Sequence, residues 1–234
     1  MLKLLSLLFL VATGLISSCG GGAGDSIRST LFGEGVRLRS MQTCTVTVNS
    51  LGDLQQALMQ AQNNGQDDVI CVQAGTYQVT QTLTYETPNG DNGKKLTIRA
   101  VGGQVVLDGG YSVRIMHINT DSDNNGGDAG ADVTIEGIGF QGGRTEYNYG
   151  GGLYVRTRQA NITLINNTFS SNIAYFWGES FSQGGGAYLS SGSGNITLTN
   201  NTFSDNNAIW GGGAYLESDS GSISALSNKV CRII

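Results

Sequence analysis

The sequence predicts an all-β fold, a β-solenoid made of stacked coils of parallel strands. Three observations favour it: a nine-residue block recurs four times without gaps, a glycine-rich block recurs in step with it, and one stretch alone has helical periodicity. The nine-residue blocks begin at Asp132, Asn161, Asn195 and Ser222, with offsets of 29, 34 and 27 residues, and the glycine blocks begin at Gly150, Gly184 and Gly211. Units of this size stack as successive coils because one unit cannot bury its apolar face alone.

Composition excludes several other classes of protein. The chain has 234 residues, 13% of them charged, with a formal net charge of −5. A nucleic-acid-binding protein needs a basic surface, and helical bundles carry far more charge. We therefore expect no nucleic-acid partner.

The first 42 residues form a leader and a tether. Residues 1–18 carry one lysine, a largely apolar run and small residues, which is typical of a secretory signal peptide and too short for a membrane span. Residues 16–19, Ile-Ser-Ser-Cys, resemble the lipobox of bacterial lipoproteins, which implies an acylated Cys19 and a lipid anchor. Gly20 follows it in place of an Asp, so the resemblance implies the outer membrane or cell surface. The alternative is an ordinary signal peptide. We expect residues 19–42 to be a flexible tether.

The solenoid domain is expected to span residues 43–234 and to begin with a capping helix. Residues 51–62 place Leu51, Leu54, Ala57, Leu58 and Ala61 at helical spacing, and Asn63-Asn64-Gly65 ends the pattern. Beyond it the period changes to two, and short strands are expected at residues 69–72, 77–79, 83–85, 96–98 and 105–107.

Cys44 and Cys71 lie in two strand-like segments on either side of this helix. In the oxidising compartment that a leader indicates, a disulfide between them would close a loop of roughly 27 residues and contribute about 3 kcal/mol. The alternative is a pair of buried free thiols.

Alternation assigns the faces of the coils, which are clearest over residues 132–230. Val133, Ile162 and Ile196 are expected to point inward with Phe140, Phe169 and Phe203, whereas threonines are expected to form a ladder on the outside. Asn167, Asn201 and Asn228 are predicted to stack as a ladder of side-chain amides at a turn.

Two resemblances support this architecture. The helix and the strands that follow it, DDVICVQAGTYQVTQTLTY and KKLTIRAVGGQVVLDGG, resemble the N-terminal cap and first coils of right-handed parallel β-helix proteins of the pectate-lyase-like group. The motifs FSSN at residues 169–172 and FSDN at residues 203–206, which alternate with GGAY blocks, resemble the repeats of chlamydial polymorphic outer-membrane proteins. The resemblance implies a right-handed helix and placement at a cell surface. Because the sequence stops in the middle of a coil, we expect the chain to be a truncated form of a longer solenoid.

A calcium site is one candidate. Asp121, Asp123, Asn125 and Gly127, with Asp132 at position twelve, resemble the start of a calcium-binding loop, and Ca²⁺ prefers such oxygen ligands. The alternative is a solvated Asp/Asn/Gly turn between coils.

Aromatic residues form a second candidate. Loops of successive coils carry Tyr147 and Tyr149, then Tyr175 and Trp177, then Trp210, and an added loop carries Phe181. Flat apolar rings on one wall could stack on sugar rings, or they could cover the turns of neighbouring coils.

The sequence offers no catalytic residues that we would assign. His117 is expected to occupy the position of Tyr154, Tyr188 and Tyr215 one coil earlier, as a surface or packing residue. Arg99 and Glu136 fall at matching positions on adjacent coils, where a cross-strand ion pair is the simpler interpretation.

We therefore expect a surface-anchored β-helix lipoprotein that acts as an adhesin or binds envelope polysaccharide without catalysis. The expected partner is a polysaccharide or a surface protein of a host or neighbouring cell, and the only expected cofactor is calcium. The alternative function is a polysaccharide lyase or glycoside hydrolase of the β-helix type, or an inactive fragment of one.

Overall fold

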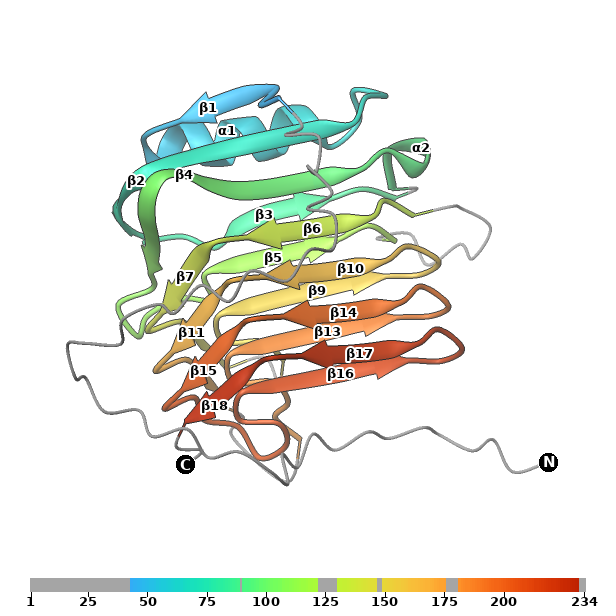
Figure 1. The fold of residues 1–234 in the computed structure, drawn as a ribbon. Helices are drawn as coiled ribbons and strands as arrows, with labels where there is room; N and C mark the ends of the chain where they lie inside the picture. The colour runs from blue at the N-terminus through green and yellow to red at the C-terminus, as the bar shows by residue number, and fades with distance from the viewer. Residues whose placement is uncertain (1–42, 89, 122–129, 147–148, 176–180, 232–234) are drawn as a thin grey trace, which may run out of the picture.

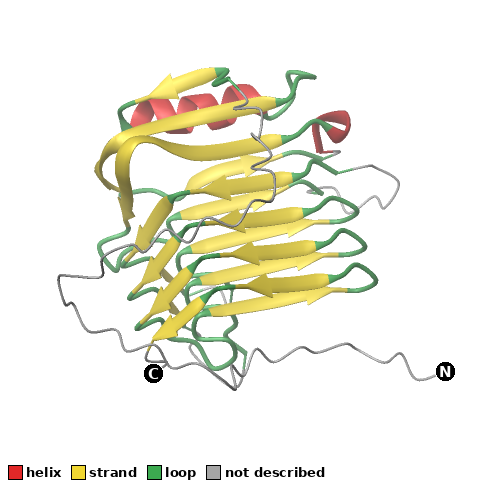
Figure 2. Cartoon of the chain, in the orientation of Figure 1, coloured by secondary structure: helices red, strands yellow, loops and turns green. Residues whose placement is uncertain are grey.

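The computed structural model describes residues 43–88, 90–121, 130–146, 149–175 and 181–231. Within them the chain forms a parallel β-solenoid of about five turns, as Figures 1 and 2 show. The predicted fold class is confirmed. The predicted signal peptide, Cys19 and the tether lie outside the described residues, so those predictions stay open.

Strands of successive coils line three sides of the solenoid. An eleven-stranded sheet wraps around two of them, which we call face I and face II, and a five-stranded sheet forms face III. The long strands β2 and β4 bend from face I into face II, and β4 pairs with β6 by its first half and with β7 by its second half. Every strand pair is parallel, so like positions of successive coils lie directly above one another.

The elements have the following bounds. Face I contains β1 (Val46–Val48), the first halves of β2 (Asp68–Gln78) and β4 (Leu96–Asp108), β6 (Val133–Glu136), β10 (Ile162–Ile165), β14 (Ile196–Thr199) and β17 (Ile223–Leu226). Face II contains the second halves of β2 and β4, β7 (Ile138–Gln141), β11 (Thr168–Ser170), β15 (Thr202–Ser204) and β18 (Lys229–Cys231). Face III contains β3 (Leu83–Glu86), β5 (Met116–Asn119), β9 (Leu153–Thr157), β13 (Ala187–Ser191) and β16 (Ala214–Ser218). A two-stranded sheet, β8 (Arg144–Thr145) with β12 (Ile173–Ala174), lies between faces II and III.

The interior is a stack of like apolar side chains, as the alternation predicts. Val133, Ile162 and Ile196 occupy one register position and are fully buried. Phe140, Phe169 and Phe203 stack with ring centroids 4.9 and 4.8 Å apart and planes within 5° of parallel. Each coil therefore buries its face against the next one, which is why no single coil is stable alone.

The predicted asparagine ladder is confirmed at the corner between faces I and II. Asn201 Nδ2 donates to the carbonyl oxygen of Leu164 at 3.0 Å and to Oδ1 of Asn228 at 3.0 Å. Its own Oδ1 accepts from the backbone N–H of Asn167 at 2.9 Å. The amide thus satisfies backbone groups that water does not reach.

A second buried ladder lies at the next corner and was not predicted. Asn172 Nδ2 donates to Oδ1 of Asn206 at 2.9 Å, and Oδ1 of Asn172 accepts from the N–H of Gly143 at 2.7 Å. At both corners the residue before the asparagine has a positive φ, for example 55° at Asn166 and 56° at Ser171. One local motif therefore makes both bends.

The N-terminal end of the solenoid is covered by α1 (Leu51–Ala61). The predicted apolar positions Leu54, Ala57, Leu58 and Ala61 are buried, and Ser50 caps the helix by accepting from the N–H of Asp53 at 3.1 Å. The amide of Gln55 donates to the carbonyl oxygen of Thr84 and accepts from its N–H at 3.0 Å. It therefore closes the open edge of β3 as a neighbouring strand would.

The second helical element, α2 (Gly90–Gly93), was not predicted. Asp91 and Asn92 inside it have φ values of 50° and 56°, so it is a tight left-handed turn rather than a regular helix. The buried Asp91 carboxylate accepts from the N–H of Gly65 at 2.9 Å, which links this turn to the end of the α1 segment.

The Cys44–Cys71 disulfide is present, as predicted. Cys71 is fully buried, and Arg99 Nε donates to its sulfur at 3.4 Å. Arg99 and Glu136 are register partners on adjacent strands, as expected. Among the described residues, no helix has the length and apolar character needed to cross a membrane.

The asparagine ladder through Asn201 should contribute strongly to stability, because its polar contacts between coils are buried. We expect Asn201→Ala to lower the free energy of unfolding by about 2–4 kcal/mol, since it leaves the N–H of Asn167 and the carbonyl of Leu164 buried without partners. The matched control is Asn195→Ala on an exposed ladder, where water replaces the lost bond to the N–H of Ser222. Urea unfolding of both variants measures the difference, and equal losses would contradict the role of burial.

Candidate functional site

The loops that connect face II to face III differ in length from coil to coil. They span residues 79–82, 109–115, 142–152, 171–186 and 205–213 in successive coils. The loops stack on one another by backbone hydrogen bonds, because β8 pairs with β12, and Tyr149, Gln183 and Trp210 form successive parallel bridges. The coils differ strongly in these loops, and binding residues in repetitive folds lie preferentially in such variable loops.

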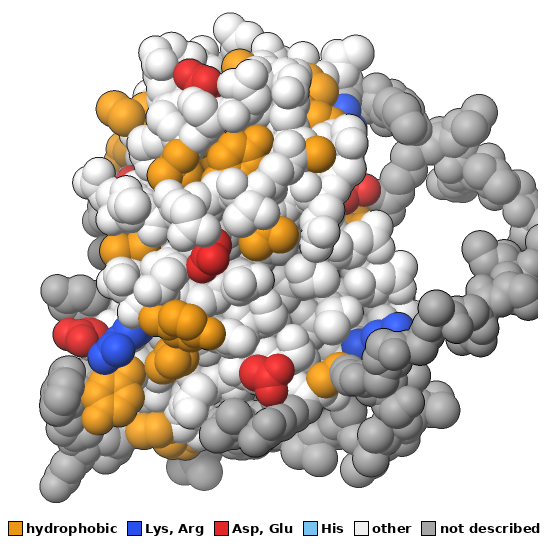
Figure 3. Space-filling view, turned by 90° about the vertical axis from the view of Figure 1, so that its left-hand side faces the viewer, with side chains coloured by type: hydrophobic (Ala, Val, Ile, Leu, Met, Phe, Trp, Pro, Cys, Tyr) orange, Lys and Arg blue, Asp and Glu red, His pale blue; other side chains and the backbone are white. Residues whose placement is uncertain are grey.

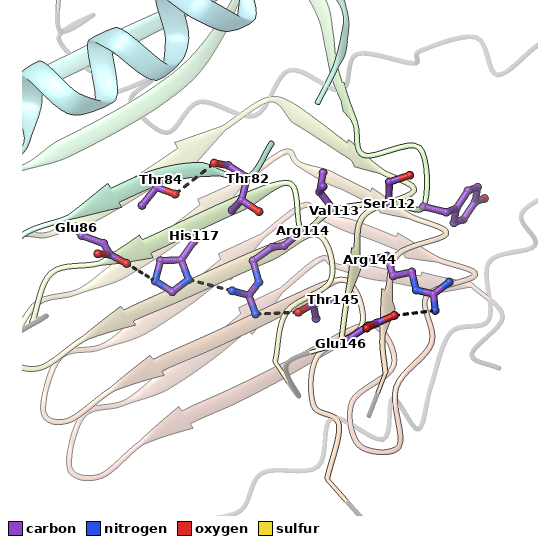
Figure 4. Close-up of a pocket in the computed structure, with 11 residues that line it drawn as sticks. Thr82, Thr84, Glu86, Ser112, Val113, Arg114, His117, Arg144, Thr145 and Glu146 are labelled. Carbon is purple, nitrogen blue, oxygen red and sulfur yellow. Dashed lines mark hydrogen bonds and ion pairs between the residues drawn. The ribbon is translucent and has the colours of Figure 1, made fainter. Parts of the chain in front are cut away.

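A cavity of about 650 Å³ opens beside the shortest of these loops. Figure 4 shows its lining, which comes from three coils: β3 supplies Thr84 and Glu86, the β4–β5 connection supplies Arg114, β5 supplies His117, and the third loop supplies Arg144, Thr145 and Glu146. Tyr111, Ser112, Val113 and Thr82 complete it. The volume is that of a small-ligand site.

Arg114 links the second and third loops beside this cavity. Its guanidinium donates from Nε to the carbonyl oxygen of Gly150 at 3.0 Å and from Nη2 to the carbonyl oxygen of Tyr149 at 2.6 Å. It also reaches Thr145 Oγ1 at 3.2 Å and lies 5.3 Å from the centre of the Tyr154 ring. Burial lowers the pKa of Arg114. Because its donors are engaged by the protein, Arg114 is a positioning residue rather than a ligand-binding group.

His117 lies between Arg114 and Glu86. Its Nδ1 is 3.1 Å from Arg114 Nη1, and its Nε2 is 3.1 Å from Glu86 Oε1. A guanidinium can only donate, so Nδ1 is the acceptor and Nε2 carries the proton that is donated to Glu86. Burial, followed by the charge of Arg114, lowers the pKa of His117 to about 4 despite the facing carboxylate. The ring is therefore neutral at pH 7, with both nitrogens occupied.

His117 begins the predicted ladder of rings on face III. The rings of His117, Tyr154, Tyr188 and Tyr215 occupy one register position, with centroid separations of 4.6, 5.3 and 5.6 Å and planes within 10° of parallel. Because each ring covers the face of the next, the ladder presents ring edges outward. Tyr188 donates to Glu217 Oε2 at 3.2 Å, and burial, then that carboxylate, raises the pKa of Tyr188. The ladder is thus packing, as expected.

Of the predicted aromatic residues, Tyr149 belongs to the same packing, and two others are exposed. The Tyr149 ring is 4.7 Å from that of Tyr188. Tyr175 and Trp210 are 42% and 36% exposed. Tyr147 and Trp177 lie outside the described residues.

Exposed apolar side chains of the fourth and fifth coils form what we call the loop strip: Tyr175, Phe181, Ile209 and Trp210. Phe181 meets Trp210 edge to face at 5.5 Å. The N–H of Tyr175 donates to the carbonyl oxygen of Thr145 at 2.8 Å, so the strip adjoins the cavity wall. Figure 3 shows one lateral face of the molecule, on which hydrophobic side chains gather in groups and charged side chains are few.

The two described residues of the predicted calcium loop are already engaged. Asp121 is buried, with its Oδ2 3.7 Å from Arg158 and 3.9 Å from Arg156. Asp132 Oδ1 accepts from the N–H of Asn161 at 2.8 Å, as the first member of an exposed ladder. Asp123, Asn125 and Gly127 lie outside the described residues. Within the part that is described, no three His, Cys, Asp or Glu side chains cluster as a metal site would require. The calcium site stays a prediction.

Several cavity residues had no recognisable signal in the sequence. Glu86, Arg114 and Arg144 come from different coils and belong to no repeated block. Tyr111 follows a Gly-Gly pair and has a φ of 57°, and only this turn signal could have drawn attention to it.

Comparison with known proteins finds no matching family model, no similar curated protein and no similar solved structure. Interpretation of the site therefore depends on its geometry.

His117 is the only histidine of the chain, so its titration can be followed without assignment. We expect the imidazole carbon-bound protons to titrate near pH 4 by NMR. The unfolded chain binds the proton near pH 6.5, so this group makes stability rise as pH increases from about 4 to about 6.5.

The Arg114→Gln variant tests the cause of this shift. It removes the cation beside Nδ1 and leaves Glu86 and Tyr154 facing the ring, so the pKa should move up toward 6.5. A wild-type pKa of 6 or above would contradict a buried, neutral His117.

Proposed function

We propose that the chain is a surface-anchored β-helix lipoprotein that binds envelope polysaccharide without converting it. The observation that carries the proposal is the loop strip of exposed apolar side chains, which begins at the wall of the cavity. The parallel solenoid supplies a rigid, extended support for such a surface. A surface protein of a host or neighbouring cell is the alternative partner.

Exposure separates the strip from the aromatic packing beside it. In the tyrosine ladder the ring faces are covered by neighbouring rings, and Tyr188 is only 8% exposed. Phe181 is 50% exposed, and Tyr175 is 42% exposed. Exposed rings that contribute little to the core are the groups on which the apolar faces of sugars stack.

The state of His117 favours binding over catalysis. A general base needs a free nitrogen near the reacting group, but Nδ1 accepts from Arg114 and Nε2 donates to Glu86. The ladder position of the ring also fixes it against Tyr154.

The anchor and the location are part of the proposal. The lipobox-like residues 16–19 support acylation of Cys19 and display at the outer membrane or cell surface, with the lipid as the only membrane attachment. Calcium is proposed to bind at residues 121–132, without a direct role in the strip.

A glycoside hydrolase is the second candidate, and one observation favours it. Glu86 and Glu146, from the first and third coils, line the same cavity. Two carboxylates facing one sugar are what such an enzyme requires. Chain-length analysis of glycans incubated with the full chain separates the two candidates, because a binding protein leaves the length unchanged and a hydrolase shortens it.

The double variant Phe181→Ala/Trp210→Ala tests the strip. We expect affinity for a retained polysaccharide to fall between about fivefold and about a hundredfold, since each of the two aromatic contacts contributes about 0.5–1.5 kcal/mol. Affinity electrophoresis in gels containing neutral and acidic glycans measures it. The control is Met59→Ala, which removes an exposed apolar side chain from α1, away from the strip. Undiminished retention of the double variant would contradict the proposal.

A further inference from the structure

We propose that the cavity binds the terminal sugar of an uncharged glycan, so that the protein recognises the end of a chain and the loop strip holds the residues next to it. This inference rests on the proposed function, and it adds both the class of glycan and the way in which it is bound.

The cavity lies where the short loop of the first coil adjoins the longer loops of the next two coils. The first loop, residues 79–82, has four residues between its strands, whereas residues 142–152 of the third coil form a much longer connection. Thr82 and Thr84 of the first coil line the cavity on one side, and Arg144, Thr145 and Glu146 of the third coil line it on another. The strip belongs to the fourth and fifth coils and adjoins the third coil at Tyr175, so a glycan chain that lies along it reaches the cavity at its end.

The polar groups of the cavity suit hydroxyl groups. Glu86 and Glu146 have half-exposed side chains, 50% and 54%, so their carboxylates can accept from sugar hydroxyls. Arg144, paired with Glu146 at 3.4 Å, is a partly exposed donor. The Thr82 hydroxyl can donate and accept, whereas the Ser112 hydroxyl donates to the carbonyl oxygen of Gly110 and so offers an acceptor.

The balance of charge excludes an acidic sugar. The cavity's two arginines and two glutamates cancel, and Arg114 is turned toward the protein. A uronate would bring a third carboxylate beside Glu86 and Glu146 on a chain whose net charge is −5. The uncharged sugars are the class that these groups fit.

Tyr111 supplies an apolar wall at the rim. Its side chain is 54% exposed. Its backbone has a φ of 57°, a conformation that bulky residues rarely adopt. The N–H of Tyr111 donates to the carbonyl oxygen of Gly142 at 2.7 Å, so the turn is fixed to the third coil. A ring held in this way offers a preformed surface for a sugar ring.

The experiment counts binding sites against chain ends. The full-length protein is tested for retention by neutral glucans, mannans, galactans and polymers of N-acetylhexosamine. Polygalacturonate is the acidic comparison. A retained neutral glycan is then divided into size fractions, and calorimetry gives the number of protein molecules bound per gram. We expect this number to rise in proportion to the number of chain ends, with about one protein per chain.

Each outcome decides a different claim. If the number of protein molecules bound per gram of glycan stays constant or falls as the glycan chains are shortened, the protein binds along the chain. This outcome overturns end recognition, while the proposed function stands. Stronger retention by polygalacturonate than by every neutral glycan overturns the uncharged class. Retention by no glycan overturns the proposed function and this inference together.

The Tyr111→Ala variant localises the site. We expect affinity for short fractions to fall about tenfold, and Met59→Ala to leave it unchanged. Circular dichroism verifies that the variant folds. Unchanged affinity in a folded Tyr111→Ala protein overturns the assignment of the cavity. The number of unaltered protein molecules bound per glycan chain end remains an independent test.

Discussion

The stacking of asparagine on asparagine at the corners of the coils is the interaction on which the rest of this structure depends. A bend between two faces leaves backbone N–H and C=O groups inside the solenoid, where each unpaired group is costly. Asn201 satisfies such groups on neighbouring coils and joins Asn167 to Asn228. A shift of one residue would remove these bonds and turn the apolar side chains outward, so the ladders fix the register of faces I and II.

This constraint leaves the connections outside the asparagine corners free to vary, among them those from face II to face III. The two asparagine corners permit almost no change in length, and strands on either side of them match from coil to coil. The connection from face II to face III begins at the ladder of Asn172 and Asn206, and no asparagine ladder fixes the described residues that follow. Its shortest form is residues 79–82, and its longest is residues 171–186. The exposed rings, the cavity and Tyr111 all lie in or beside these connections, because there a coil can differ from its neighbours without loss of register.

Repetition made the fold predictable from the sequence, and lack of repetition hid the cavity. Residues that recur at fixed spacing or at helical period predict four features of the structure. These are the phenylalanine stack, the ladder through Asn167, the tyrosine ladder and the capping helix. The ladder through Asn172 was present in the same repeated motif but was not recognised as a second corner. Glu86, Arg114 and Arg144 occur once each, and only the stacking of three coils brings them together. The left-handed turn at Asp91 gave no helical signal, because its conformation follows from local turn chemistry and a long-range bond to Gly65.

The most direct test of the account is hydrogen exchange of the full chain with and without a retained neutral glycan. The account predicts that added protection is confined to the loops at residues 79–82, 109–115, 142–146, 171–175, 181–186 and 205–213, which surround the cavity and carry the strip. The strands of face I, with their outward threonines, should exchange at the same rate in both samples. Protection on face I, or none in these loops at saturating glycan, would contradict the placement of the binding surface.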